Sequence, residues 1–205
     1  MIGYYNYTVV LTYLGMLISF AGIMNALNGD VKGAVICLIL SGVCDMFDGK
    51  IASTRARTSS EKRFGIQIDS LSDFLSFGVL PAVIGYCLNQ VSKGYFYIAC
   101  IYVLCALIRL AYFNVNEEER QRDTTAARST YQGLPVTTAA IIIPVTYVIS
   151  SMMNQSFVYS VGLACMAICF LLPIKVKKPN RKGNMIIGIA GSIELVLLMI
   201  GVGGY

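Results

Sequence analysis

The chain has 205 residues, of which 56% are hydrophobic and 13% are charged, and its formal net charge is +5. A soluble fold of this size would lack the polar surface needed to cover its core, so the composition indicates a membrane protein. The absence of histidine excludes imidazole-based catalysis and the usual zinc sites. The seven cysteines show no CxxC spacing, and we expect them to be small core residues rather than disulfides or metal ligands.

Seven stretches are apolar and long enough to cross a bilayer, which takes roughly 20 helical residues. In chain order they are Thr8–Leu27, Gly33–Ala52, Ile68–Leu88, Tyr95–Val115, Leu134–Met153, Phe157–Ile174 and Met185–Val202. The segment from Glu117 to Arg128 carries charges of both signs and is predicted to be a solvated connector. The sequence therefore predicts an all-α integral membrane protein, a polytopic bundle of about six to seven transmembrane helices in one domain over residues 1–205.

Lysine and arginine are concentrated on one side of this predicted bundle. All but two of the sixteen basic residues lie after spans two, four and six or at the ends of these spans, and only Lys32 and Lys93 fall on the other side. Because basic loops favour the cytoplasm, we expect that face to be cytoplasmic. The expected location is the plasma membrane of a prokaryote, and no nucleic-acid partner is expected.

Four aspartates lie inside or at the ends of the second and third predicted spans, where an unpaired charge costs a few kcal/mol. Asp45 and Asp48 are three residues apart, and Asp69 and Asp73 are four apart, so each pair shares one helical face. Because the two spans are consecutive and antiparallel, their cytoplasmic ends are neighbours, and four carboxylates can surround one small volume. Oxygen ligands select hard cations, Mg²⁺ first, with Mn²⁺ and Ca²⁺ as alternatives. We expect a site for one or two divalent ions.

A salt-bridge network at the helix ends is the structural alternative. The basic partners for such a network are Lys50, Arg55 and Arg57. It would explain neither the depth of Asp45 nor the glycines that accompany the acids. Gly49 follows an aspartate directly and Gly65 precedes one by four residues, and each glycine lets a ligand approach the backbone closely. Glu194, within the last span, stands apart from these acids and is expected to be a packing or dimer-contact residue.

Two segments together resemble the signature of the CDP-alcohol phosphatidyltransferases, which reads D-x2-D-G-x2-A-R and, about eight residues later, G-x3-D-x3-D. They are Asp45–Ala52 (D-M-F-D-G-K-I-A) and Gly65–Asp73 (G-I-Q-I-D-S-L-S-D). Ser53 stands in the place of the signature arginine, and the spacer up to the second segment holds eleven residues. Ser53, Arg55 and Arg57 are therefore the candidates for the substrate phosphate contact. Three further segments, Ile68–Pro81, Arg109–Asn114 and Tyr131–Pro135, resemble the phosphatidylserine synthase branch of that family.

The resemblance implies an activity and roles for individual residues. The family transfers the phosphatidyl group of CDP-diacylglycerol to an alcohol and releases CMP, and in this branch the alcohol is L-serine. It implies a homodimer of helical bundles among membrane lipids, with Mg²⁺ or Mn²⁺ in an active site that opens to the cytoplasm. The implied metal ligands are Asp45, Asp48, Asp69 and Asp73, and Asp73 is also the implied general base. The residues implied to line CMP are Gly49, Ala52 and Gly65.

Recognition of free serine calls for a cation with planar donors near the serine carboxylate. Arg109, the one basic residue within a predicted span, is a candidate for that carboxylate or for a substrate phosphate. The alternative is that it extends to lipid headgroups or pairs with an acid. Asn114 and Gln132 are weaker candidates for the same pocket.

Two other functions compete with this one. An acceptor such as glycerol 3-phosphate or inositol phosphate would call for a dedicated cluster of arginines or lysines beside the metals. A divalent-cation transporter would spread its acids along a path through the bilayer, whereas four of the five acids within the spans fall at one membrane face.

Overall fold

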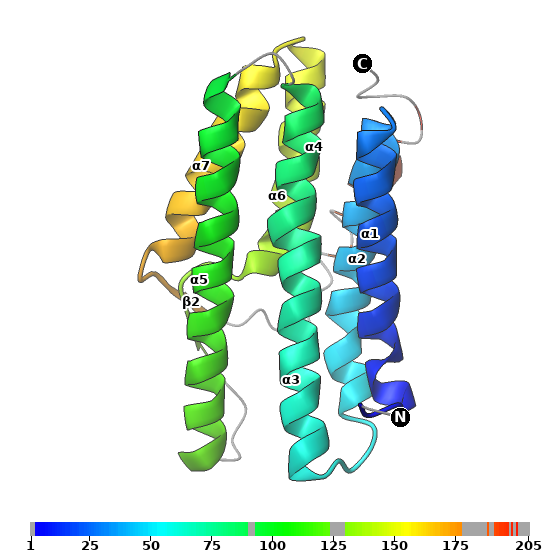
Figure 1. Ribbon diagram of the computed structural model, residues 1–205, viewed down its shortest axis with the longest axis vertical. Helices are drawn as coiled ribbons and strands as arrows, with labels where there is room; N and C mark the ends of the chain where they lie inside the picture. The colour runs from blue at the N-terminus through cyan, green and yellow to red at the C-terminus, as the bar shows by residue number, and fades with distance from the viewer. Residues whose placement is uncertain are drawn as a thin grey trace.

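The long helices of the bundle lie side by side along one long axis (Figure 1). The computed structural model describes residues 3–89, 93–123, 130–177, 188, 191–196, 198 and 200. The helical elements are η1 (Tyr7–Val9), α1 (Val10–Leu27), α2 (Val31–Ala52), α3 (Ser59–Asp73), η2 (Phe74–Val79), α4 (Leu80–Leu88), α5 (Lys93–Asp123), η3 (Val136–Thr138), α6 (Ala139–Met152) and α7 (Ser156–Leu171). The segments α3, η2 and α4 follow one another without a break and form one long helix.

Several helices have the length and composition of membrane spans. Among the described residues, Tyr7–Leu27, Ser59–Leu88 and Gly94–Arg120 are long and apolar enough to cross a bilayer, and Val136–Met152 and Ser156–Leu171 are shorter apolar helices. The helix α2 has 22 residues but carries four charged ones. These features confirm the predicted polytopic helical membrane protein. Half of the seventh predicted span, Met185–Val202, lies outside the described residues.

The third predicted span begins too late. Hydropathy places its start at Ile68, whereas the helix starts at Ser59. A capping box fixes the true start, because the Thr58 hydroxyl accepts a hydrogen bond from the Glu61 backbone N–H at 3.2 Å, and Glu61 accepts one from the Thr58 N–H at 2.8 Å. Hydropathy registers only the apolar part of such a helix, so its polar first turns escape a search for spans.

The predicted connector after span four is wrong for residues 117–123, which continue α5 as far as Asp123. An ion pair between Arg120 and Glu117, one turn apart, supports this extension. Residues 124–129 lie outside the described part of the chain. Beyond them the structure contains two short strands that the sequence analysis does not predict. Strand β1 (Thr130–Gln132) pairs antiparallel with β2 (Lys175–Lys177).

The most extensive contact between helices is that of α1 with α2, and small residues make it possible. The buried residues of α1 are Thr12, Gly15, Ser19, Gly22 and Ala26, which form a single stripe. A Cβ atom added to Gly22 would lie 2.8 Å from the Cβ of Cys37 on α2, closer than side chains can approach. The stripe thus lets the two helix backbones come together, as small residues do in membrane bundles.

The cysteines only partly follow the prediction that all of them are core residues. All seven are free thiols and Cys105 is buried, but Cys100 and Cys165 are exposed on the outer face of the bundle. A small apolar side chain costs little on a surface that faces lipid, so hydropathy alone does not distinguish the two environments.

Three buried tyrosines hold the helix that follows Asp73. The segment η2 is π-helical, and Pro81 just beyond it has no N–H to donate to the Phe77 carbonyl four residues earlier. The hydroxyl of Tyr102 on α5 donates to that carbonyl at 2.6 Å. The hydroxyls of Tyr95 and Tyr159 donate to the carbonyls of Ala82 and Pro81 at 2.8 and 2.9 Å. Helices α5 and α7 are therefore bonded to the backbone just beyond the aspartates.

Candidate metal centre and active site

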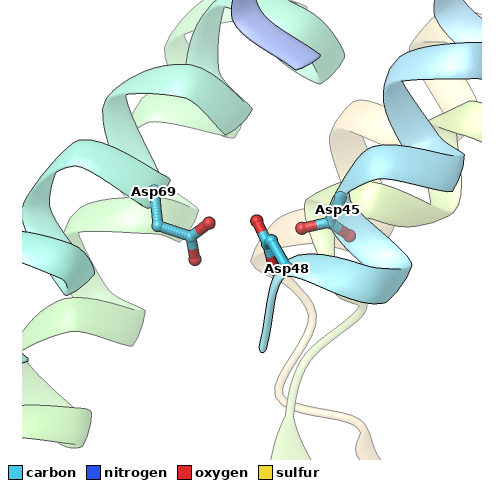
Figure 2. Close-up of side chains that lie close together, drawn as sticks. All are labelled: Asp45, Asp48 and Asp69. Atoms are coloured by element: carbon cyan, nitrogen blue, oxygen red, sulfur yellow. The ribbon is translucent and has the colours of Figure 1, made fainter. Parts of the chain in front are cut away.

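Three of the predicted aspartates converge from two neighbouring helices. Figure 2 shows Asp45 and Asp48 on α2 and Asp69 on α3 directed toward one another. One carboxylate oxygen from each residue lies within 4.8 Å of those from the other two. Asp48 is 9% exposed, and the other two are partly buried. The antiparallel turn from α2 into α3 brings the two acidic faces together.

Asp73 lies one turn beyond Asp69 and outside this group of three. Its side chain lies near that of Asp45, whereas the side chain of Asp69 lies near that of Asp48. Asp73 also lines a small cavity of about 10 Å³ together with Asp45, Asp48 and hydroxyl groups from neighbouring helices. That volume is about what one water molecule needs. The fourth acid therefore faces a polar space beside the other three.

The electrostatics of this cluster call for a cation or for shared protons. Carboxylates at such separations repel one another strongly unless a proton or a cation lies between them. Among the described side chains, no lysine or arginine forms an ion pair with any of the four acids. Lys50 instead lies over the ring of Phe47, 4.9 Å from its centre. The salt-bridge alternative is thus wrong, and an all-oxygen donor set fits Mg²⁺ or Mn²⁺.

The two signature glycines lie at the rim of the cluster in different surroundings. A Cβ atom added to Gly49 would meet nothing within 4 Å, so the backbone there is open to a ligand. At Gly65 an added Cβ would lie 3.1 Å from Nη1 of Arg57, so that guanidinium covers this glycine. Ala52 is partly buried at the last residue of α2. The hydroxyl of Ser53, in the place of the signature arginine, donates to the Lys50 carbonyl at 2.7 Å and ends the helix.

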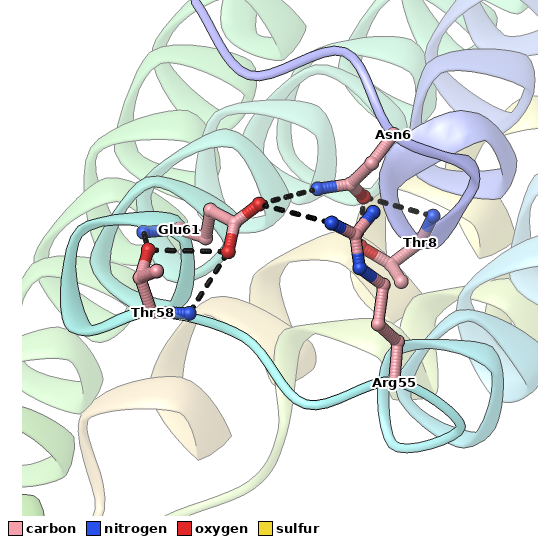
Figure 3. Close-up of polar contacts among 5 residues, drawn as sticks. All are labelled: Asn6, Thr8, Arg55, Thr58 and Glu61. Carbon is pink, nitrogen blue, oxygen red and sulfur yellow. Dashed lines mark hydrogen bonds and ion pairs between the residues drawn. The ribbon is translucent and has the colours of Figure 1, made fainter.

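Arg55 belongs to a separate polar network, drawn in Figure 3. Its guanidinium lies 3.9 Å from the Glu61 carboxylate. The side-chain amide of Asn6 donates to the same carboxylate at 3.2 Å, and its oxygen caps η1 by accepting from the Thr8 backbone N–H at 3.0 Å. The chain before α1 is thereby fastened to the start of α3. Of the two candidate arginines, Arg55 is held by Glu61 and Arg57 is the one at the signature glycine.

The three remaining predicted residues lie on α5 and β1. Arg109 is 5% exposed, and it donates to the carbonyls of Leu134 and Gly133 at 2.9 and 3.2 Å. Gly133 has a φ of +82°, a conformation that glycine adopts without strain. Asn114 accepts a hydrogen bond from Ser70, the neighbour of Asp69, at 2.7 Å. Gln132 lies in β1, and its side chain is outside the described part of the chain.

A residue that the sequence analysis does not single out also reaches the cluster. The hydroxyl of Thr12 on α1 donates to Oδ2 of Asp48 at 3.2 Å. The hydroxyl of Ser72 on α3 donates to the Thr12 carbonyl at 3.3 Å. The only sequence signal for Thr12 is its place in the stripe of small residues on α1.

Comparison with known families agrees with the geometry. The sequence profile of the CDP-alcohol phosphatidyltransferases matches residues 5–174, a range that includes the whole acidic cluster and Thr12. The chain belongs to this family. In this CDP-alcohol phosphatidyltransferase the family signature forms the acidic cluster, with Asp45, Asp48 and Asp69 grouped and Asp73 beside them.

Three curated relatives show what the chain is similar to. It is 35% identical over 147 residues to a CDP-diacylglycerol–serine O-phosphatidyltransferase of Saccharomyces cerevisiae, over 66% of this chain and 52% of the relative. It is 31% identical over 142 residues to an archaetidylserine synthase of Methanothermobacter thermautotrophicus, over 67% of this chain and 56% of the relative. A CDP-diacylglycerol–serine O-phosphatidyltransferase of Helicobacter pylori is 28% identical over 142 residues, over 67% of this chain and 53% of the relative. The chain thus spans about half the length of the curated relatives it matches.

Proposed function

We propose that this chain transfers the phosphatidyl group of CDP-diacylglycerol to the hydroxyl of L-serine, forming phosphatidylserine and releasing CMP. The observation that carries the proposal is the convergence of Asp45, Asp48 and Asp69, at the signature positions of the family, to within 4.8 Å of one another. The names of the relatives support serine as the acceptor, since each of them includes it.

The proposed metal ligands are Asp45, Asp48 and Asp69, with Asp73 as a fourth candidate. Their carboxylate oxygens match the preference of Mg²⁺ and Mn²⁺. When bound, such ions neutralise the charge on the phosphate oxygens of the substrate and of the departing CMP. The open backbone at Gly49 leaves room for the nucleotide beside the cluster.

The acid–base chemistry falls to Asp73. The serine hydroxyl oxygen forms a bond to the phosphorus that carries the diacylglycerol, the bond from that phosphorus to the CMP oxygen breaks, and the hydroxyl proton passes to the Asp73 carboxylate. CMP leaves as an anion, so no second proton transfer is needed. The position of Asp73, outside the group of three but facing the same polar cavity, supports this division of roles.

The residues around the acidic cluster are assigned to two pockets, one for the nucleotide and one for serine. Gly49, Ala52 and Gly65 line the CMP moiety in this proposal, and Arg57 takes the place of the signature arginine. Its guanidinium already lies against Gly65, whereas the Ser53 hydroxyl is used at the end of α2. The serine pocket is assigned to Arg109, Asn114 and Gln132. Arg109 bonds to the turn between β1 and η3, and Asn114 bonds to Ser70.

The setting of the enzyme is part of the proposal. We place it as a homodimer in the plasma membrane of a prokaryote, with residues 1–205 as a single transmembrane domain. The bias of lysine and arginine toward one side supports an active site that faces the cytoplasm.

An assay of acceptor choice tests the function. The purified full chain is supplied with CDP-diacylglycerol and with serine, glycerol 3-phosphate or inositol phosphate in turn, and CMP release is measured with and without a chelator. We expect release with serine only, loss of release on chelation, and recovery when Mn²⁺ is added. Release with a phosphorylated alcohol and none with serine would contradict the serine assignment. A cation transporter would release no CMP with any acceptor.

A further inference from the structure

The helix α1 contributes a polar side chain to a site that the family signature assigns to α2 and α3. The Thr12 hydroxyl donates to Oδ2 of Asp48 at 3.2 Å, across 36 positions of sequence. Both side chains are buried, with Thr12 8% exposed and Asp48 9% exposed. A threonine within a helix commonly bonds back to its own helix, so a hydroxyl turned instead toward a carboxylate on a neighbouring helix is a specific contact.

The backbone around Thr12 is fixed from two sides. The Ser72 hydroxyl on α3 donates to the Thr12 carbonyl at 3.3 Å, which ties α1 to the helix that carries Asp69. One turn further along α1, a Cβ atom added to Gly15 would lie 3.2 Å from the Cβ of Cys44 on α2. These two contacts fix the distance from α1 to α2 and to α3 near the Thr12 hydroxyl that donates to Asp48.

We propose that Thr12 is a positioning residue of the metal centre, which fixes the rotation of the Asp48 carboxylate so that it is ready to bind the ion. A hydrogen bond to one oxygen of a metal-binding carboxylate restricts its orientation, and loss of such a partner typically costs tenfold or more in metal affinity. The inference rests on the proposed function, because it takes Asp48 to be a metal ligand. It adds α1 to the two helices from which the family signature builds the site.

The test compares variants that keep or remove the hydroxyl, with Mn²⁺ alone as the probe. Binding of Mn²⁺ to purified full-length protein is followed by the loss of the electron paramagnetic resonance signal of the free ion. We expect Thr12→Val to need about tenfold more Mn²⁺ than the wild type for half-saturation. Thr12→Ser, which keeps the hydroxyl, should stay within about twofold of the wild type.

Ser19→Ala is the matched control, because it removes another buried hydroxyl from the same stripe of α1. The Ser19 hydroxyl donates to Ser76 at 2.6 Å rather than to an aspartate. We expect it to bind Mn²⁺ as the wild type does. If Thr12→Val fails to fold, as judged by size-exclusion chromatography, Thr12→Ala takes its place, because it removes the hydroxyl without adding volume. Its Mn²⁺ binding is then compared with that of Thr12→Ser.

A readout of turnover separates this inference from the proposed function. The Mn²⁺ concentration for half-maximal CMP release should rise in Thr12→Val in parallel with binding, while the KM for serine stays unchanged. Equal Mn²⁺ binding by the wild type and by Thr12→Val or Thr12→Ala would overturn the positioning role, as would no binding by the wild type. A wild type that binds Mn²⁺ but releases no CMP with serine would overturn the proposed function, and the binding comparison would still decide the role of Thr12.

Discussion

Individual side chains divide the acidic cluster into two parts. Asp45, Asp48 and Asp69 form the group that can share an ion, and Asp73 stands one turn away beside a cavity that three of the four acids line. In the proposed function this difference separates metal binding from proton transfer, so substitutions at the two parts should have different effects.

Asp73→Asn tests the proton-transfer role directly. Asparagine keeps the shape of the side chain but cannot take up the serine proton, so the rate of CMP release should fall by about 10²- to 10⁴-fold. Binding of CDP-diacylglycerol, followed by equilibrium titration, should remain. Asp30→Asn, at the cap of α2 where the side chain accepts from Gly33 N–H, is the matched control and should keep full activity. An undiminished rate in Asp73→Asn would remove the base assignment.

Arg57→Gln and Arg55→Gln distinguish the two candidate arginines. Because Arg57 lies against Gly65 and Arg55 is held by Glu61, only the first change should weaken substrate binding. We expect the KM for CDP-diacylglycerol to rise about tenfold in Arg57→Gln, in keeping with the loss of one charged hydrogen bond of about 1.5 kcal/mol. Arg55→Gln should change it little. The reverse order in steady-state kinetics would show that the loop rearranges when the nucleotide binds.

Sequence reasoning identifies those site residues whose relation is local. The spacing of Asp45 with Asp48, and of Asp69 with Asp73, follows from helical periodicity and is readable without coordinates. The choice between Arg55 and Arg57 cannot be made from the sequence, because it depends on a loop conformation to which Asn6 contributes from far away in the chain. The contact of Thr12 with Asp48 has no local signal, since it depends on how α1 packs.

At the scale of elements, the helix that carries Asp69 and Asp73 is specialised along its length. It begins with a capping box, passes the acids, widens into the π-helical segment η2 and continues as α4 through Pro81. Backbone carbonyls near the widened segment receive hydrogen bonds from tyrosine hydroxyls on α5 and α7. The position of Asp73 thus depends on elements that carry no acidic residue of the site.

Tyr102→Phe tests the support of this helix. The change leaves the Phe77 carbonyl buried without the donor that replaces the missing N–H of Pro81, and a buried unpaired group costs about 1–3 kcal/mol. The protein should unfold at lower temperature in detergent than the wild type. Tyr97→Phe, which removes a hydroxyl from an exposed tyrosine on the same helix, should leave the midpoint unchanged. Equal midpoints for both variants would mean that the hydroxyl of Tyr102 is not structurally important.

The ends of elements are where sequence reasoning fails most. The apolar centres of α1, α2 and α5 are predicted because hydropathy depends on composition alone. The start of α3 and the end of α5 are misplaced because they depend on a capping box at Thr58 and on the Arg120–Glu117 pair, which lie in polar sequence. The strands β1 and β2 lie more than forty residues apart in the chain, and each is only three residues long, too short to show a periodic pattern.

At the scale of the whole molecule, the acidic cluster brings together side chains from two helices, α2 and α3. An ion shared by Asp45 and Asp48 on α2 and by Asp69 on α3 would cross-link the bundle at one end. Because such an ion binds the folded state and not the separated helices, it should stabilise the fold.

Thermal unfolding measures the stability that this shared ion would add to the fold. At a Mn²⁺ concentration about 100 times its dissociation constant, the wild type should gain about 2.7 kcal/mol of stability and unfold at a higher temperature. Asp69→Asn should lose most of that gain, because it removes the ligand from α3, while Asp30→Asn should keep it. A similar gain in Asp69→Asn would place the ion elsewhere.

The most direct measurement is the position of the ion itself. A structure of the full chain with Mn²⁺, determined with anomalous scattering at the manganese edge, should show a peak bonded to the carboxylates of Asp45, Asp48 and Asp69. An anomalous peak away from these three side chains, or none at saturating Mn²⁺, would contradict the account.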